Sequence, residues 1–131
     1  MAGLERSTEN IMGAWGHGNL DSDSARDFLA GFSKVQFLRI IELLKHPRSH
    51  KFDCEEIDEL FGLIEIIFVL HEREMLEWAP ERKEFRNLFR PYLKRWDTYH
   101  KEWGGGIDAE RRKVIKETFM KLVAVIRDKN S

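Results

Sequence analysis

Apolar side chains recur at intervals of three and four residues through most of the chain after residue 24. This spacing lines them along one side of an α-helix, whereas a β-strand would place every second residue on one face. The first such stripe consists of Ala25, Phe28, Leu29 and Phe32. The pattern predicts an all-α fold, a compact bundle of about five helices that follows a glycine-rich lead-in.

Local signals set the expected number of helices. Gly31 and Ser33 interrupt the first stripe, and Ser33 with a glutamine three residues later resembles a capping box, so a second helix is expected to begin there. Pro91 lacks a backbone N–H and clashes with the preceding turn, which predicts a break or kink just before it. Asp108 is expected to cap the last helix, after the glycine run at 104–106.

Composition indicates one domain and restricts its partners. The chain has 131 residues, of which 42% are hydrophobic and 34% charged, and this is enough for a single core. A net charge of −1 argues against general affinity for nucleic acid or an anionic membrane. Cys54 is the only cysteine, which fits a reducing cytoplasm. We expect a flexible N-terminal extension over residues 1–11 and a single helical domain over residues 12–131.

Three aspartates, Asp21, Asp23 and Asp27, follow the glycine-rich stretch MGAWGHGN. Carboxylate oxygens are the ligands that Mg²⁺ and Ca²⁺ prefer, so these residues are a candidate site for a divalent metal. The stretch lacks the further ligands and the terminal glutamate of a calcium-binding loop. A structural role is therefore the preferred interpretation, and no metal or other cofactor is expected.

In that structural interpretation, Asp21 or Asp23 caps the following helix. Trp15 packs as an indole plug between helices, and Gly16 and Gly18 let the backbone pass closely beside it. The opening stretch then holds the bundle together and does not bind a ligand.

The same stretch resembles the N-terminal signature of the domain-of-unknown-function 4259 family, whose members start near M-G-x-W-G-x-G and continue to A-x-D-F. The matching positions are Met12, Gly13, Trp15, Gly16, Gly18, Leu20, Asp21, Asp23, Ala25, Asp27 and Phe28. The resemblance covers residues 12–28 and is loose beyond them. It implies a compact helical domain of a mostly bacterial family and supplies no known chemistry.

His46, His50 and Cys54 follow one another at four-residue intervals and are plausible zinc ligands. Pro47 interrupts the helix that would align them, and the paired spacing of structural zinc sites is absent. These side chains are expected to lie in a surface loop, and zinc binding is the alternative.

Glu65 is flanked on both sides by apolar residues and is expected to be buried. A buried carboxylate is costly unless it is paired, and Arg86 or Arg90 is the expected partner. A carboxyl group with a raised pKa, acting in a pocket, is the functional alternative. No nucleophile-with-base motif accompanies Glu65, so no catalytic residue is assigned and we do not expect an enzyme.

Charge is segregated along the sequence. Residues 53–77 contain nine acids against Arg73 alone, and residues 80–103 contain seven Lys and Arg against four acids. The acids Glu55, Glu56, Asp58 and Glu59 exceed what helix capping requires. Such an acidic patch can steer a basic protein partner, so these four residues are the expected partner-binding site.

Together these patterns predict a cytoplasmic, non-catalytic protein-binding domain, most concretely a bacterial immunity-type protein that neutralises a partner toxin through an acidic surface. The alternative is a small-molecule or divalent-metal-binding module that uses the three aspartates or the His46, His50 and Cys54 loop. The oligomeric state is open. A homodimer would use the exposed edge of the Trp96–Trp103 stripe.

Overall fold

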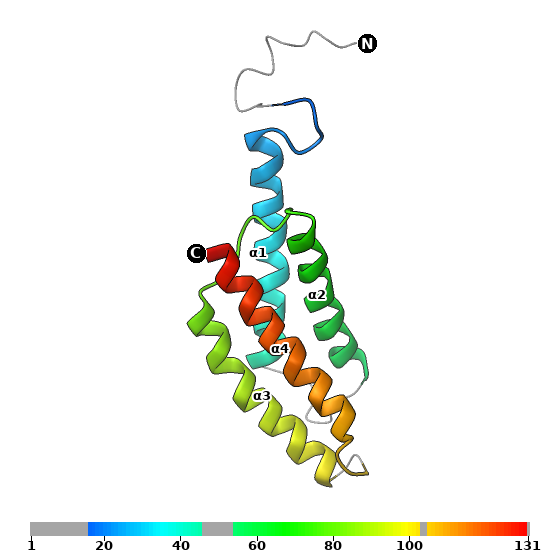
Figure 1. Cartoon of the computed structure of the whole chain (residues 1–131). Coiled ribbons are helices and arrows are strands. Elements are labelled where there is room, and N and C mark those ends of the chain that lie inside the picture. The colour runs from blue at the N-terminus through cyan, green and yellow to red at the C-terminus, as the bar shows by residue number, and fades with distance from the viewer. Residues whose placement is uncertain (1–15, 46–53, 103–104, 131) are drawn as a thin grey trace.

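The computed structural model describes residues 16–45, 54–102 and 105–130 (Figure 1). These residues form four helices and no strand: α1 (Asp23–Lys45), α2 (Cys54–Glu72), α3 (Arg82–Glu102) and α4 (Ala109–Asn130). The all-α class is confirmed, and the expected number of about five helices is one too many. Among the described helices, none combines the length and the apolar character needed to span a bilayer.

The expected helix start at Ser33 is wrong, because α1 continues through this residue without a break. Ser33 is fully buried, and its hydroxyl donates a 2.7 Å hydrogen bond to the carbonyl oxygen of Leu29, one turn back in the same helix. The side chain that would cap a new helix is thus bonded inside an existing one. Two expected helices therefore merge into α1.

The expected break near Pro91 is also wrong, because α3 continues past it. Pro91 is exposed, and so is Asn87, whose carbonyl loses its backbone donor. Water can therefore hydrate that carbonyl, which lowers the cost of a proline inside a helix. The continuous helix keeps Phe85, Tyr92 and Trp96 buried on one side. Trp96, at the start of the stripe expected to form a homodimer contact, is thus buried, and Trp103 lies outside the described residues. The homodimer itself stays a prediction.

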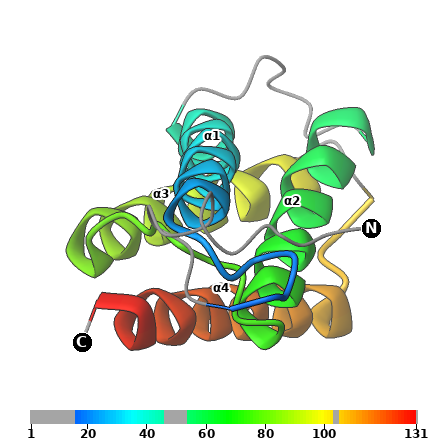
Figure 2. The ribbon, with the colours of Figure 1, turned by 90° about the horizontal axis from the view of Figure 1, so that it is seen from above.

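The four helices occupy the corners of a four-sided arrangement, which Figure 2 shows from above. α1 contacts α2 and α3, and α4 contacts the same two helices. Aromatic rings fill the centre: the fully buried Phe37 meets Trp78 and Phe85 edge-on, at centroid distances of 5.9 and 5.7 Å. The outer side between α1 and α2 therefore lies opposite the outer side between α3 and α4.

Polar side chains and glycines define the ends of α3 and α4. The Asp108 carboxylate accepts hydrogen bonds from the backbone N–H groups of Glu110 and Arg111 at 3.0 and 3.1 Å, so the expected cap of the last helix is confirmed. Gly105 and Gly106 have φ angles of 82° and 112°, which residues with a side chain rarely adopt. These glycines allow the chain to reverse between the two helices.

The C-terminus of α2 ends in a Schellman motif centred on Glu74. The backbone N–H of Met75 donates to the carbonyl of Leu70 at 2.7 Å, and that of Glu74 donates to the carbonyl of His71 at 3.1 Å. The motif requires a left-handed residue, and Glu74 supplies it with a φ of 57°. Among the described residues, Glu74 is the one non-glycine residue with a positive φ.

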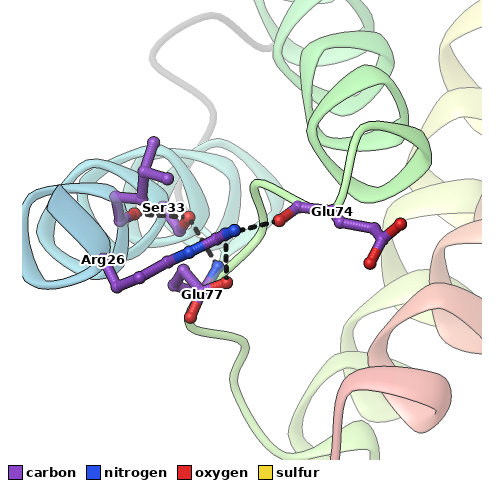
Figure 3. A network of polar contacts seen from close by, with 5 residues as sticks. Arg26, Ser33, Glu74 and Glu77 are labelled. Carbon is purple, nitrogen blue, oxygen red and sulfur yellow. Dashed lines mark hydrogen bonds and ion pairs between the residues drawn. The ribbon is translucent and has the colours of Figure 1, made fainter. Parts of the chain in front are cut away.

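The linker between α2 and α3 is fastened to α1 by a polar network (Figure 3). The Arg26 guanidinium donates from Nη1 to the Glu74 carbonyl at 2.6 Å and to the Glu77 carboxylate at 2.9 Å. The backbone N–H of Glu77 lies 3.4 Å from the Ser33 hydroxyl oxygen, which accepts a long hydrogen bond. Ser33 thus serves both its own helix and the linker.

Candidate functional site

The side of α1 that faces away from the core carries large apolar side chains. Phe32, Val35 and Leu38 are exposed there, with 62% of Val35 open to solvent. The opposite side of the same helix already supplies the core, including the fully buried Phe37 and Ile40. The core of the bundle therefore does not use the apolar side chains of this exposed stripe.

α2 extends this stripe with Ile66 and Val69, which are about half exposed. The two helices run in opposite directions (Figure 1). The ion pair between Arg39 and Glu59 shows which residues of the two helices lie at the same level. Phe32 lies two turns before Arg39, and Ile66 lies two turns after Glu59, so both reach the same level. We use the name α1/α2 face for five of the exposed apolar side chains on these two helices: Phe32, Val35, Leu38, Ile66 and Val69.

Acidic side chains border the α1/α2 face. Over its length α2 carries six acids and neither Lys nor Arg, and Arg73 follows directly after its end. The acids at the border are Glu42 of α1 and Glu55, Asp58, Glu59 and Glu65 of α2. Within the described part of the chain, no ion pair or hydrogen bond of the side chain involves Glu55, Asp58 or Glu65.

Arg39 neutralises part of this border. Its Nε and Nη2 donate to the two carboxylate oxygens of Glu59 at 2.6 and 2.8 Å, and its Nη1 donates to Glu42 at 2.5 Å. The hydrogen bonds to Glu59 and then to Glu42 raise the pKa of Arg39 far above its ordinary value. Glu59 is therefore held by its own chain.

The four acids expected to bind a partner thus differ in their surroundings. Glu55 and Asp58 are exposed, Glu59 is exposed but held by Arg39, and Glu56 is half-buried. Glu55 and Asp58 are thus the two acids of this set that share their charge with no other side chain in the described part of the chain.

The expectation that Glu65 is buried is wrong, because its side chain is exposed. The core takes Ile64, Ile67 and Phe68 from this part of α2, and the remaining side of the helix, including Glu65, turns outward. The expected partners, Arg86 and Arg90, lie on α3, at the opposite corner of the bundle from α2, and within the described residues no ion pair joins either of them to Glu65. Glu65 is therefore a surface charge and not part of an internal ion pair.

The turn before α1 is built around the Asp21 carboxylate. Its Oδ2 accepts a 2.9 Å hydrogen bond from the backbone N–H of Gly18. A Cβ at Gly16 or Gly18 would lie 2.6 or 2.7 Å from that oxygen, so a side chain at either position would displace the Asp21 carboxylate. The expected cap at Asp21 or Asp23 is wrong, because Ser22 caps α1 by accepting the N–H of Ala25 at 3.1 Å.

Among the described residues, no three His, Cys, Asp or Glu side chains come together in a way that could hold a metal ion. Asp21, Asp23 and Asp27 therefore do not form a joint site. Three of the other sequence candidates, Trp15, His46 and His50, lie outside the described residues, and so does the side chain of Cys54.

No protein-family model, no curated protein and no solved structure matches this chain. The resemblance of residues 12–28 to the domain-of-unknown-function 4259 family therefore stays a prediction.

Proposed function

We propose that this chain is a non-catalytic protein-binding domain that uses the α1/α2 face to bind a basic protein. The observation that supports this most is the apolar stripe of Phe32, Val35 and Ile66 with an acidic border. An apolar centre with a polar rim is the usual anatomy of a specific protein–protein contact. The unshared charges of Glu55 and Asp58 favour a partner with Lys and Arg around its own apolar patch.

The most concrete version of this proposal is a cytoplasmic, bacterial immunity-type protein. In that role the α1/α2 face covers the working surface of a basic toxin, such as a nuclease. The acidic side chains of α2 would speed association with the basic toxin, and the apolar centre of the face would slow dissociation of the complex. The resemblance of the opening stretch to a mostly bacterial family is compatible with this role.

The experiment uses the protein encoded by the adjacent gene as the probe, because an immunity protein neutralises a toxin that is encoded next to it. Calorimetry with that purified protein should give a complex whose affinity falls as salt is raised. Replacing Val35 and Leu38 by serine should weaken the complex about tenfold or more, as for truncation near an interface centre. Growth of cells that produce the adjacent protein should be protected by the native chain and less well by this variant.

Matched controls lie on α4. Met120→Ser is the control for the apolar variant, because it removes an apolar side chain that is as exposed as Val35. The acidic border is tested with the double variant Glu55→Lys and Asp58→Lys. Its control is the double variant Glu110→Lys and Glu117→Lys, which changes the net charge by the same amount. The α4 variants should bind like the native chain. The proposal would be contradicted if the α1/α2 variants and the α4 variants lost the same amount of affinity. It would also be contradicted if the chain and the adjacent protein formed no complex.

A further inference from the structure

Residues of α3 and α4 line a groove. These two helices lie on the side of the bundle opposite the outer side of α1 and α2 (Figure 2). The volume of the groove is about 790 Å³. The floor is apolar, and its residues are Phe89, Leu93, Phe119, Met120, Val123 and Ala124. Met120 is 70% exposed, so the floor is open to a ligand.

Cationic side chains form both walls of this α3/α4 groove. On α3, Arg86, Arg90 and Lys94 recur every four residues and so form a row along the helix. The cations on the α4 wall are Arg112, Lys116 and Arg127. Positive charge thus recurs at every turn along α3 and stands toward both ends of the α4 wall.

One acid, Asp97, lines the groove, and it is already neutralised. Its two carboxylate oxygens accept hydrogen bonds from Arg112 at 2.8 and 2.9 Å. Within the described residues, no ion pair or side-chain hydrogen bond involves Arg86, Arg90, Lys94, Lys116 or Arg127. The groove therefore carries five unshared positive charges beside an apolar floor.

We propose that the α3/α4 groove binds an acidic amphipathic helix of a partner protein. At a rise of 1.5 Å per residue, the lining runs roughly 16 Å along α3, from Arg86 to Asp97, and roughly 22 Å along α4, from Arg112 to Arg127. A helix of about three to four turns has this length. Its apolar stripe would pack on the floor, and acids on both flanks would meet the two cationic walls.

Other anionic ligands fit the groove less well. A lipid or fatty acid carries its charge at one end and would leave most of the two walls unmatched. A single-stranded nucleic acid needs exposed ring faces on which its bases can stack. The rings of Phe89 and Phe119 already stack on each other, with centroids 4.3 Å apart and planes 2° apart.

This site does not depend on the proposed function, because it uses the opposite side of the molecule and a partner of opposite charge. A second copy of the chain, docking α2 into the groove, is a competing occupant. That arrangement is head-to-tail and would build concentration-dependent oligomers. The experiment therefore includes a measurement of mass.

The probe is a display library of random peptides of about 16 residues, selected on the full chain and counter-selected on Ala124→Arg, which fills the groove. Enriched peptides should carry apolar residues at helical spacing flanked by Asp and Glu. Their affinity, measured by fluorescence anisotropy, should fall at least about tenfold with Arg90→Glu and Lys94→Glu.

The matched control is Lys83→Glu with Lys113→Glu, which changes two exposed cations on the same helices outside the groove. It alters net charge equally and should change affinity less than about twofold. No enrichment, enrichment without acids, or equal loss in both variants would overturn the proposal. So would concentration-dependent oligomers that Arg90→Glu dissolves, or tighter groove-dependent binding of labelled oligo-dT or of phosphatidylglycerol vesicles.

Discussion

Replacing Glu74 by glycine should stabilise the protein, although it removes a charged side chain from a hydrogen-bonded turn. Glu74 ends α2 with a φ of 57°, a conformation that costs a residue with a Cβ about 1–2 kcal/mol. Its side chain is exposed, and Arg26 binds its backbone carbonyl, which glycine retains. Glycine loses about 0.5–1 kcal/mol through the greater freedom of the unfolded chain. The net gain is therefore about 0.5–1 kcal/mol.

For a domain of this size, that gain corresponds to a rise in the melting temperature of about 2–4 °C. Calorimetry and urea denaturation should both report it. Glu74→Ala is the control, because alanine removes the charge and keeps the strained φ. Alanine should leave the melting temperature unchanged or lower it. Equal stabilisation by alanine and glycine would refute the argument from φ and point to charge repulsion, and no gain from glycine would refute the strain itself.

Two further predictions concern α3. Pro91→Ala should raise the free energy of unfolding by about 2 kcal/mol, as measured by urea denaturation. Alanine restores a backbone donor inside the helix, and this gain is reduced because alanine gives the unfolded chain more conformational freedom than proline does. The hydrogen bonds from Arg112 lower the pKa of Asp97, so the stability that this pair adds is present above the ordinary pKa of the carboxyl. Asp97→Asn should therefore be less stable than the native chain at neutral pH, and the difference should vanish as pH falls through the lowered pKa. A difference that persists in acid would contradict this reasoning.

The helical class follows from apolar spacing alone, whereas the number of helices does not. Ser33 with a glutamine three residues later has the same sequence pattern whether its hydroxyl caps a new helix or bonds back to Leu29. The choice depends on tertiary burial, because the Ser33 hydroxyl also meets the linker at Glu77. Pro91 illustrates the same point. The burial of Tyr92 and Trp96, which follow Pro91 in α3, outweighs the clash of the proline ring with the preceding turn.

The candidate site was partly visible in the sequence. The acids at the start of α2 were evident from charge, and Glu55 and Asp58 do remain exposed. The part of the apolar centre that α2 supplies was missed because α2 is apolar on nearly every side, so the sequence does not indicate which of its residues face inward. The rotation of α2 against α1 and α4 decides this, and it places Ile66 and Val69 outside together with Glu65.

The sequence indicated one wall of the basic groove, as the basic segment over residues 80–103. Arg86, Arg90 and Lys94 are spaced for one side of α3, but nothing in the sequence says that α4 lies beside them. A groove needs two walls, and the second wall, with Lys116 and Arg127, comes from residues that are distant along the chain. Long-range pairing of this kind is a property of the assembled bundle.

The placement of the α1/α2 face and the α3/α4 groove on opposite sides has a consequence for assembly. A ligand on either side is separated from the other by the whole thickness of the helical core, so the two need not exclude each other. Because the two sides also differ in the sign of their charge, a basic protein would be attracted to the α1/α2 face and an acidic protein to the α3/α4 groove. Under the two proposals above, both proteins would bind one copy of the domain at the same time.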